Sequence, residues 1–365
     1  MPSASSGKKP RILISGVGNK YGGTETVVSR FIGALSGRFA FDTICHGPYK
    51  QPEYTMWDNR VITIPAKRMH PLSHAIELRK FFRENCNSYS ALWHNANSFS
   101  NIDTLELAAD ADIPVRICHF HNTQVLGNPL NKALSALHKK KAGDLATVRL
   151  ACSAEAGRFA YGNLPFSVVN NAFELNSFVY SERKRFEIRN ELGLVDKFVI
   201  GNVGRLAEQK NQSVLINSMP LVLSKKLNAV LVIVGDGPLK QRLLDEAKAL
   251  GVEKSVYFVG TRLDVNDVLS AFDVFAFPSL FEGLGVAVVE AQVNGLPCVV
   301  SNRVPSSAIV SNTVNVLPPD DPAIWADRIC SSSRDDFQLD SALACRYELS
   351  REAERLAELF DFSVH

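Results

Sequence analysis

The sequence carries little net charge, few cysteines and no long hydrophobic run. Its 40 lysines and arginines nearly balance 38 aspartates and glutamates, and a net charge of +2 does not favour a nucleic-acid-binding protein. The seven cysteines are dispersed and none forms a Cys-x-x-Cys pair, which indicates buried thiols in a reducing compartment. No run reaches the ~18 apolar residues of a membrane-spanning helix, and residues 1–10 lack the apolar stretch of a signal peptide. We therefore expect a soluble, cytoplasmic protein, and its mild basicity leaves open a peripheral contact at the inner face of the membrane.

Length and hydrophobic periodicity predict two domains. The 365 residues exceed one ordinary core, and 46% of them are hydrophobic. Short runs of Val, Ile and Leu alternate with helical patterns, which is typical of parallel sheets covered on both faces. The expected strands are 11–15, 39–45, 61–64, 89–94, 115–119, 147–152, 198–203, 230–234, 256–259, 274–276 and 299–300. The expected helices are 24–35, 73–84, 130–142, 211–224, 238–250 and 265–271. We predict an α/β protein of two doubly wound, Rossmann-like halves that face an interdomain cleft.

Two cations follow the first strand of the second half. The strand ends at Gly204 and Arg205, and Lys210 and Asn211 come shortly after. The planar fork of an arginine and the point charge of a lysine suit a diphosphate, although a solvated surface loop explains the same residues on their own. The next strand ends in Val234-Gly235-Asp236-Gly237-Pro238, which by itself predicts a tight turn into a helix.

A glycine-containing loop with two carboxylates follows a later strand. Residues 277–291 read Phe-Pro-Ser-Leu-Phe-Glu-Gly-Leu-Gly-Val-Ala-Val-Val-Glu-Ala, so Glu282 and Glu290 flank Gly283 and Gly285. Amides at a helix start attract anions, and a carboxylate accepts hydrogen bonds from two vicinal hydroxyls. We expect one helix to place the two carboxylates about 80° apart around its axis and ~12 Å apart along it. A capping glutamate and an ordinary helix glutamate are the plainer alternative.

Two histidines close a strand of the first half, in the sequence Arg116-Ile-Cys-His-Phe-His-Asn-Thr123. Strand alternation places His119 and His121 on the same face. A zinc site would need a convincing third ligand, and only His94 is available, at the neighbouring strand end. Buried histidines with local hydrogen bonds are the other alternative.

Two further patterns carry less weight. Gly16-Val17-Gly18 follows the first strand, but the third glycine of a dinucleotide fingerprint arrives one place late and no acidic residue closes the second strand. Asp110-Ala111-Asp112 has the Asp-x-Asp form of a metal-binding signature, yet its position before Ile113-Pro114 favours a surface turn.

Taken together, these motifs resemble the Glu-x7-Glu signature and the companion motifs of the retaining glycosyltransferases of family 4, which have the GT-B fold. The match runs in order through Gly204-Arg205 with Lys210-Asn211, then 235–238, and then 282–297. Tyr21-Gly22-Gly23 resembles the family's first glycine-rich loop, and His-x-His-Asn resembles the subgroup that builds capsular and exopolysaccharide chains. The resemblance implies an acceptor-binding domain at 1–175, a donor-binding domain at 176–340, and a helical segment at 341–365 that packs back on the first domain.

The resemblance also implies residue roles. Arg205 and Lys210 would neutralise the donor diphosphate, so neither a cofactor nor a metal is implied. Glu282 would hold hydroxyls of the transferred sugar, and His121, with His119 as its rival, would stabilise the oxocarbenium-like charge. The implied binding residues, Glu290 for the ribose and Thr261 near the base among them, are Gly22, Gly23, His119, Gly204, Asn211, Gly237, Thr261, Gly283, Leu284, Gly285 and Glu290.

The expected function follows from that resemblance. It is the transfer of a hexosyl or N-acetylhexosaminyl group, with retention, from a nucleotide-diphosphate sugar to a glycan or lipid-linked acceptor. UDP is the nucleotide that the subgroup favours. The alternatives are a nucleotide-sugar epimerase or hydrolase on the same scaffold, a non-catalytic nucleotide-sugar-binding subunit and, on the weak glycine pattern at 16–18, an oxidoreductase.

Overall fold

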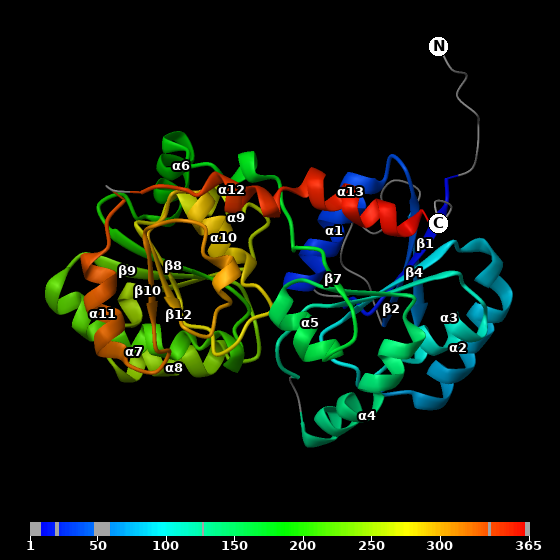
Figure 1. The fold of residues 1–365 in the computed structure, drawn as a ribbon. Helices are drawn as coiled ribbons and strands as arrows, with labels where there is room; N and C mark the ends of the chain where they lie inside the picture. The colour runs from blue at the N-terminus through cyan, green and yellow to red at the C-terminus, as the bar shows by residue number, and fades with distance from the viewer. Residues whose placement is uncertain (1–8, 19–21, 47–58, 126–127, 335–336, 362–365) are drawn as a thin grey trace, which may run out of the picture. The chain divides into compact units, whose positions relative to one another are not determined.

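The computed structural model describes residues 9–18, 22–46, 59–125, 128–334 and 337–361, and the chain divides into two compact units (Figure 1). The first unit comprises Met1–Phe173 together with Leu349–His365, and the second comprises Glu174–Glu348. The unit boundaries therefore lie at 173/174 and 348/349, compared with 175/176 and 340/341 expected from the sequence. Within the described ranges, no helix is both long and apolar enough to cross a membrane.

The first unit is built on a parallel sheet with the strand order β3-β2-β1-β4-β5-β6-β7. Helix α1 packs with α13 on one side of this sheet, and α2, α3, α4 and α5 follow one another along the other side (Figure 1). The strands are β1 (Arg11–Ser15), β2 (Ala40–His46), β3 (Arg60–Ile64), β4 (Ala91–Ala96), β5 (Val115–Phe120), β6 (Val148–Ala151) and β7 (Ser167–Val168). The helices are α1 (Gly23–Leu35), α2 (Pro71–Asn85), α3 (Asp103–Asp110), α4 (Pro129–Leu145), α5 (Ala154–Tyr161) and α13 (Leu349–Phe360).

The second unit has a parallel sheet of its own, with the order β10-β9-β8-β11-β12-β13. Helices α7, α8 and α11 cover one face, and α6 packs with α9 on the other (Figure 1). The strands are β8 (Phe198–Val203), β9 (Ala229–Val234), β10 (Val256–Gly260), β11 (Val274–Phe277), β12 (Cys298–Ser301) and β13 (Val314–Leu317). The helices are α6 (Glu182–Leu192), α7 (Gln212–Lys225), α8 (Lys240–Ala249), α9 (Val265–Ser270), α10 (Val286–Val293), α11 (Pro322–Ser331) and α12 (Ser341–Ala344).

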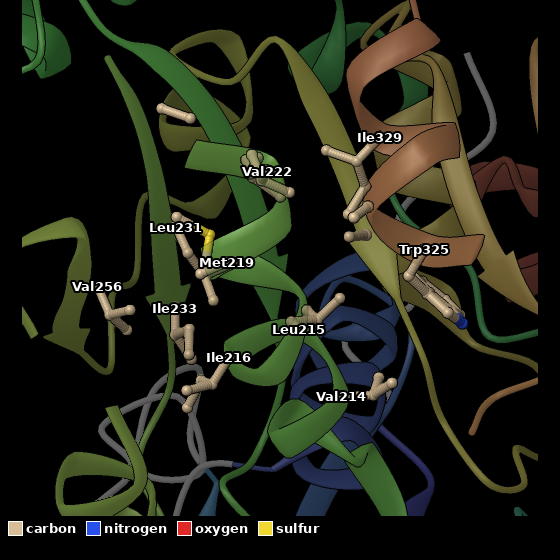
Figure 2. Close-up of a cluster of buried hydrophobic side chains, with 14 of the residues drawn as sticks. Val214, Leu215, Ile216, Met219, Val222, Leu231, Ile233, Val256, Trp325 and Ile329 are labelled. Carbon is tan, nitrogen blue, oxygen red and sulfur yellow. The ribbon is translucent and has the colours of Figure 1, made fainter. Parts of the chain in front are cut away.

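Figure 2 shows the core beneath the second sheet, where α7 and α11 meet β9. Met219 of α7 packs over Leu231 and Ile233, and Trp325 and Ile329 enter from α11. These side chains are buried, and removing each from water contributes on the order of 1.5–3 kcal/mol. The core therefore fixes β8 and β9, and with them the loops that leave their carboxyl ends.

Helix α13 completes the first unit. Its apolar face buries Leu356 and Phe360, and the Phe360 ring contacts those of Phe39, Phe41 and Trp93. On the same helix Glu352 is buried and accepts a hydrogen bond from the amide of Asn170 at 2.6 Å. The last helix of the chain thus packs on the strands of the first unit.

Asp42 is a fully buried carboxylate near the amino end of β2, remote along the strand from the carboxyl edge of the sheet. It accepts hydrogen bonds from the guanidinium groups of Arg11 and Arg60 and from the hydroxyl of Tyr89 at 2.7 Å. Burial and this carboxylate raise the pKa of Tyr89. A buried charge is costly unless it is paired. The two arginines and the tyrosine therefore offset the cost of burying the Asp42 carboxylate.

Replacing this carboxylate should destabilise the first unit. We expect Asp42→Asn to lower the free energy of unfolding by at least about 2 kcal/mol, because the charge-assisted bonds to two guanidinium groups are lost. Urea denaturation followed by circular dichroism measures the change. The exposed Asp144→Asn serves as the control and should stay within about 0.5 kcal/mol of wild type. An Asp42→Asn protein as stable as wild type would contradict this account of the cluster.

Candidate active site

Three loops interlock at the carboxyl edge of the second sheet. The amide of Gly204, after β8, donates to the carbonyl of Val234 at 2.9 Å, and the amide of Gly235, after β9, donates to the carbonyl of Gly260 at 2.8 Å. Leu206 closes the arrangement by donating to the carbonyl of Asp236 at 3.0 Å. The ends of β8, β9 and β10 are therefore joined by backbone bonds.

Glycine is required at two places in this interlock. A Cβ at Gly235, where φ is +137°, would lie 2.1 Å from the carbonyl oxygen of Gly204. A Cβ at Gly237 would lie 2.3 Å from the carbonyl oxygen of Leu206. Close backbone packing thus accounts for both glycines, and a role of Gly237 in ligand binding stays a prediction.

Lys210 and Glu282 form an ion pair beside this interlock. The Lys210 Nζ lies 2.5 Å from Glu282 Oε1 and 4.7 Å from the centre of the Phe277 ring. The two side chains are only 18% and 8% exposed. Gln209 fixes the loop that carries Glu282, because its side-chain amide donates to the carbonyl of Phe281 at 2.9 Å. Two sequence-predicted residues that lie 72 positions apart are thereby brought into contact.

The helix geometry expected for the two glutamates is wrong. Helix α10 begins at Val286, and its cap Gly285 has a left-handed φ of 86°, so Glu282 lies on the preceding loop and not on the helix. Glu290 is on α10 and is buried. The reason is the αL residue, which changes the chain direction between the loop and the helix. Gly283 and Leu284, on the same loop, are buried as well.

The remaining predicted residues of the second unit differ in the contacts that their side chains make with the rest of the unit. Asn211, in a left-handed conformation, donates from its side chain to the carbonyl of Pro319 at 2.7 Å. Thr261 is exposed, and its neighbour Arg262 pairs with carboxylates. Arg205 is exposed, and its guanidinium makes no hydrogen bond or ion pair with any described residue. Among the predicted residues named here, this arginine is therefore an exposed cation without a described partner.

In the first unit His119 and His121 lie together, with ring centres 4.1 Å apart. His119 is fully buried, and its Nδ1 accepts a bond from the indole of Trp93 at 3.4 Å. The Nε2 of His121 lies 2.9 Å from Asn95 Oδ1. Trp93 and Asn95, the partners of the two histidines, belong to the Trp-His-Asn-Ala-Asn segment that ends β4. Of this segment, the sequence indicated only His94 as a candidate. The only signal for Asn95 was its place at the end of a strand.

Burial keeps these histidines neutral. It lowers the pKa of His121 to about 4 and that of His94 to about 4, and it lowers the pKa of His119 well below the ordinary value, with the neighbouring His121 adding to the effect. Among the described residues, no group of three or more His, Cys, Asp or Glu side chains could hold a metal ion.

The first glycine-rich loop lies partly outside the described residues, because Tyr21 is not among them. Gly22 caps α1 in an extended conformation, and the space around the Cα of Gly23 is open. Gly16 has a φ of +80°, and a Cβ there would lie 1.7 Å from the carbonyl oxygen of Asn95. The glycine at 16 is therefore explained by the close approach of β1 to β4.

Comparison with known sequences gives a family match within the second unit, a relative that aligns along nearly the whole chain, and a relative that aligns along part of it. Residues 184–346 match the model described as glycosyl transferases group 1. The putative glycosyltransferase EpsF of Bacillus subtilis (strain 168) is 27% identical over 381 residues, 99% of this chain and 98% of that protein. The UDP-Gal:alpha-D-GlcNAc-diphosphoundecaprenol alpha-1,3-galactosyltransferase of Escherichia coli is 36% identical over 153 residues, 41% of this chain and 40% of that protein.

Solved structures give the fold. Anabaena HepE in complex with UDP has a TM-score of 0.76 at 19% identity, and the match covers 96% of this chain and 98% of that chain. WaaG, a glycosyltransferase involved in lipopolysaccharide biosynthesis, has a TM-score of 0.69 at 15% identity, over 96% of this chain and 100% of that chain. These likenesses confirm the predicted fold class, GT-B, with two Rossmann-like parallel-sheet domains.

Because His94 and His121 are buried and neutral, we predict that the folded protein loses stability as the pH falls. A group whose pKa is lower in the folded than in the unfolded state binds its proton on unfolding, so it weakens the fold as pH falls. For His94 and His121 the window runs from pH 6.5 down to about 4, with a loss of about 1.4 kcal/mol per pH unit for each histidine. Urea titrations across this pH range measure how the free energy of unfolding changes with pH. His94→Gln should reduce it, whereas substitution of the exposed His70 should not. A free energy of unfolding that is flat from pH 6.5 to 4 would contradict the prediction.

Proposed function

We propose that this chain, whose second unit is a glycosyl transferases group 1 domain, is a retaining, metal-independent glycosyltransferase of family 4. It transfers a sugar from a UDP-sugar to a glycan or lipid-linked acceptor in polysaccharide synthesis. The observation that carries the proposal is the part-buried Lys210–Glu282 ion pair at the carboxyl edge of the second sheet, with Arg205 exposed on the same loop as Lys210.

The chemistry follows from the charges at this edge. Departure of a nucleoside diphosphate leaves negative charge on its outer phosphate, and fixed positive groups stabilise that charge in a partly buried site. Arg205 offers the guanidinium that no described residue occupies, and Lys210 offers an ammonium whose partner, Glu282, is itself an acceptor for sugar hydroxyls. Arg205 and Lys210 would stabilise the charge of the leaving diphosphate, as a divalent ion does in other enzymes. This is the basis for proposing metal independence.

The relatives support the donor and acceptor classes. HepE was crystallised with UDP, and the Escherichia coli relative is named for a UDP-sugar donor and a diphosphoundecaprenol-linked acceptor. EpsF, which matches along the whole chain, is named a glycosyltransferase. We therefore propose UDP as the nucleotide and a polyprenol-linked or free glycan as the acceptor.

Substituting Lys210 and Glu282 one at a time tests the proposal. Lys210→Ala should lower turnover by at least about a hundredfold and weaken UDP binding, because one of the cations at the leaving group is removed. Glu282→Gln should lower turnover comparably and leave UDP binding as strong as in wild type or stronger, because the ammonium of Lys210 is no longer neutralised. Calorimetry with UDP and initial rates with the UDP-sugar that a thermal-shift screen identifies measure the two effects. Glu208→Gln, on the same short turn but exposed, is the matched control and should change neither.

The same assay distinguishes the other functions. Turnover unaffected by both ion-pair variants would refute the assignment, and donor consumed without acceptor would favour an epimerase or hydrolase. Binding of UDP with no product from any acceptor would favour a binding subunit. The anomeric configuration of the product, read by NMR, tests retention, and activity abolished by EDTA would refute metal independence.

Peripheral contact with an anionic membrane surface is a further part of the proposal. Leu72, Ile76, Arg79 and Arg83 of α2 are spaced by four, three and four residues, so they form one stripe on the outward face of the helix. The two apolar side chains are 79% and 66% exposed, and Met69, just before the helix, is 74% exposed. Apolar side chains next to arginines on one helix face suit the interface of an anionic bilayer.

Vesicle sedimentation tests this contact. We expect the protein to sediment with phosphatidylglycerol vesicles more than with phosphatidylcholine vesicles, and Leu72→Glu with Ile76→Glu to reduce the bound fraction at least fivefold by adding charge to the apolar part of the stripe. Leu227→Glu is the control, because Leu227 is 90% exposed but lies in the second unit. Equal binding by the double variant and wild type would remove the stripe from the proposal.

A further inference from the structure

A hollow of about 620 Å³ lies at the amino end of the first sheet, opposite the carboxyl edge where the two histidines lie. Its wall contains Arg11, the first residue of β1, and Arg60, the first residue of β3. Lys9 precedes β1, and Ser90 directly precedes β4. The described residues that line the hollow all belong to the first unit. It is therefore a different place from either carboxyl edge.

The wall of this hollow carries more positive than negative charge. Arg11 and Arg60 share one carboxylate, that of the fully buried Asp42. Lys9 is a third cation, and its Nζ donates to the carbonyl oxygen of Ser36 at 2.7 Å, a partner without charge. None of the described lining residues is acidic. Three cations thus face a single carboxylate, and two positive charges have no counter-charge in the described part of the wall.

The two guanidinium groups also keep unused donors and remain open to solvent. Arg11 donates to Asp42 through Nη1, and its Nε and Nη2 make no hydrogen bond with a described residue. Arg60 donates to the same carboxylate through Nε and Nη2, so its Nη1 likewise lacks a described partner. The side chains of Arg11 and Arg60 are 20% and 57% exposed, whereas that of Asp42 is inaccessible. A ligand in the hollow therefore meets guanidinium donors and not the carboxylate.

This arrangement suits a phosphate group. A phosphate monoester carries a charge of about −1.5 to −2 at pH 7, which the two uncompensated cations match. Its oxygens accept hydrogen bonds from the planar fork of an arginine and from the ammonium of a lysine. Because Asp42 already holds both guanidinium groups, binding orders fewer side chains than it would at a pair of solvated arginines. The volume also leaves room for the molecule that bears the phosphate, since small-molecule sites occupy roughly 300–1,000 Å³.

We propose that this hollow binds a phosphate monoester, with Arg11, Arg60 and Lys9 as the cations that hold it. Asp42 fixes the two guanidinium groups and makes no contact with the ligand. The residues of this site are different from those proposed for the nucleotide sugar, so the site adds a second ligand and does not depend on the proposed transferase reaction. The phosphate can come from either of two sources, a dissolved phosphate ester or the headgroup of a lipid.

Calorimetry with inorganic phosphate tests the site. We expect the wild type to bind phosphate, and the double variant Lys9→Gln, Arg60→Gln to bind it at least fivefold more weakly, because two of the three cations are removed. The UDP affinity of this variant should stay within twofold of wild type, since neither residue belongs to the second unit. Lys248→Gln with Lys254→Gln is the charge-matched control, because both lysines are exposed, and it should leave the phosphate affinity unchanged.

A single substitution keeps the test valid if the double variant does not fold. Lys9 is exposed and bonds only to a backbone carbonyl, so Lys9→Gln should unfold in urea as the wild type does and still weaken phosphate binding at least twofold. Arg205→Gln, in the second unit, should leave the phosphate affinity of the hollow unchanged. A wild type that does not bind phosphate, or a Lys9→Gln protein that binds it as tightly as wild type, would overturn the proposal. Neither result bears on the proposed transferase activity, which the ion-pair variants test separately.

Vesicle sedimentation distinguishes the two sources of the phosphate. The 3-10 turn η2 (Cys86–Ser88) borders the hollow through Ser88 and directly follows α2, the helix proposed to contact an anionic bilayer. If the phosphate belongs to a lipid headgroup, the double variant should sediment with phosphatidic acid vesicles at least fivefold less than wild type and the charge-matched control. Equal sedimentation of the double variant and wild type, together with the loss of phosphate binding, would assign the site to a dissolved phosphate ester.

Discussion

One part-buried pair of opposite charges, Lys210 and Glu282, joins two loops of the second unit. Neither group tolerates burial by itself, because the cost of removing a charge from water is offset only by a partner at hydrogen-bond distance. The surrounding backbone fits this pair. Gly204 carries no Cβ, and one there would lie 3.3 Å from the Cδ of Lys210, so glycine leaves room for the stem of the lysine.

The two units carry different chemistry at the carboxyl edges of their sheets. In the second unit the groups are charged, namely Lys210, Glu282 and the exposed Arg205. In the first unit the groups are neutral, since burial lowers the pKa of His119 and His121 and the partner of His121 is an amide. Each edge is thus described by itself: charged side chains at the edge of the second sheet, and neutral, buried imidazoles at the edge of the first.

The sequence predicted the strands well, and it singled out some of the residues that the structure brings together at the candidate site. Buried parallel strands read as apolar runs, so β8, β9 and β10 were found nearly to the residue. Helix α6 was not predicted, because seven of its eleven residues are charged and its few apolar residues give a weak helical pattern. Lys210 and Glu282 were singled out by their motifs, but their contact depends on loops that meet only in three dimensions. Asn95 and Asp42 were missed because a single polar residue within a strand gives no periodic signal that distinguishes a structural from a functional role.

Two arginines of the second unit show why the sequence alone could not distinguish a paired from an unpaired cation. Arg205 and Arg262 each follow a strand that ends at the same edge, and both lie beside a glycine turn. The guanidinium of Arg262 bonds to Glu191 and Asp264, and these carboxylates raise its pKa, so its charge is already neutralised locally. No described residue neutralises Arg205. A cation that is satisfied by its own fold contributes stability, whereas one left in solvent at a sheet edge is available to a phosphate. The difference arises from Asp264, just before α9, and from Glu191 on α6, which lies 71 positions from Arg262 in the sequence.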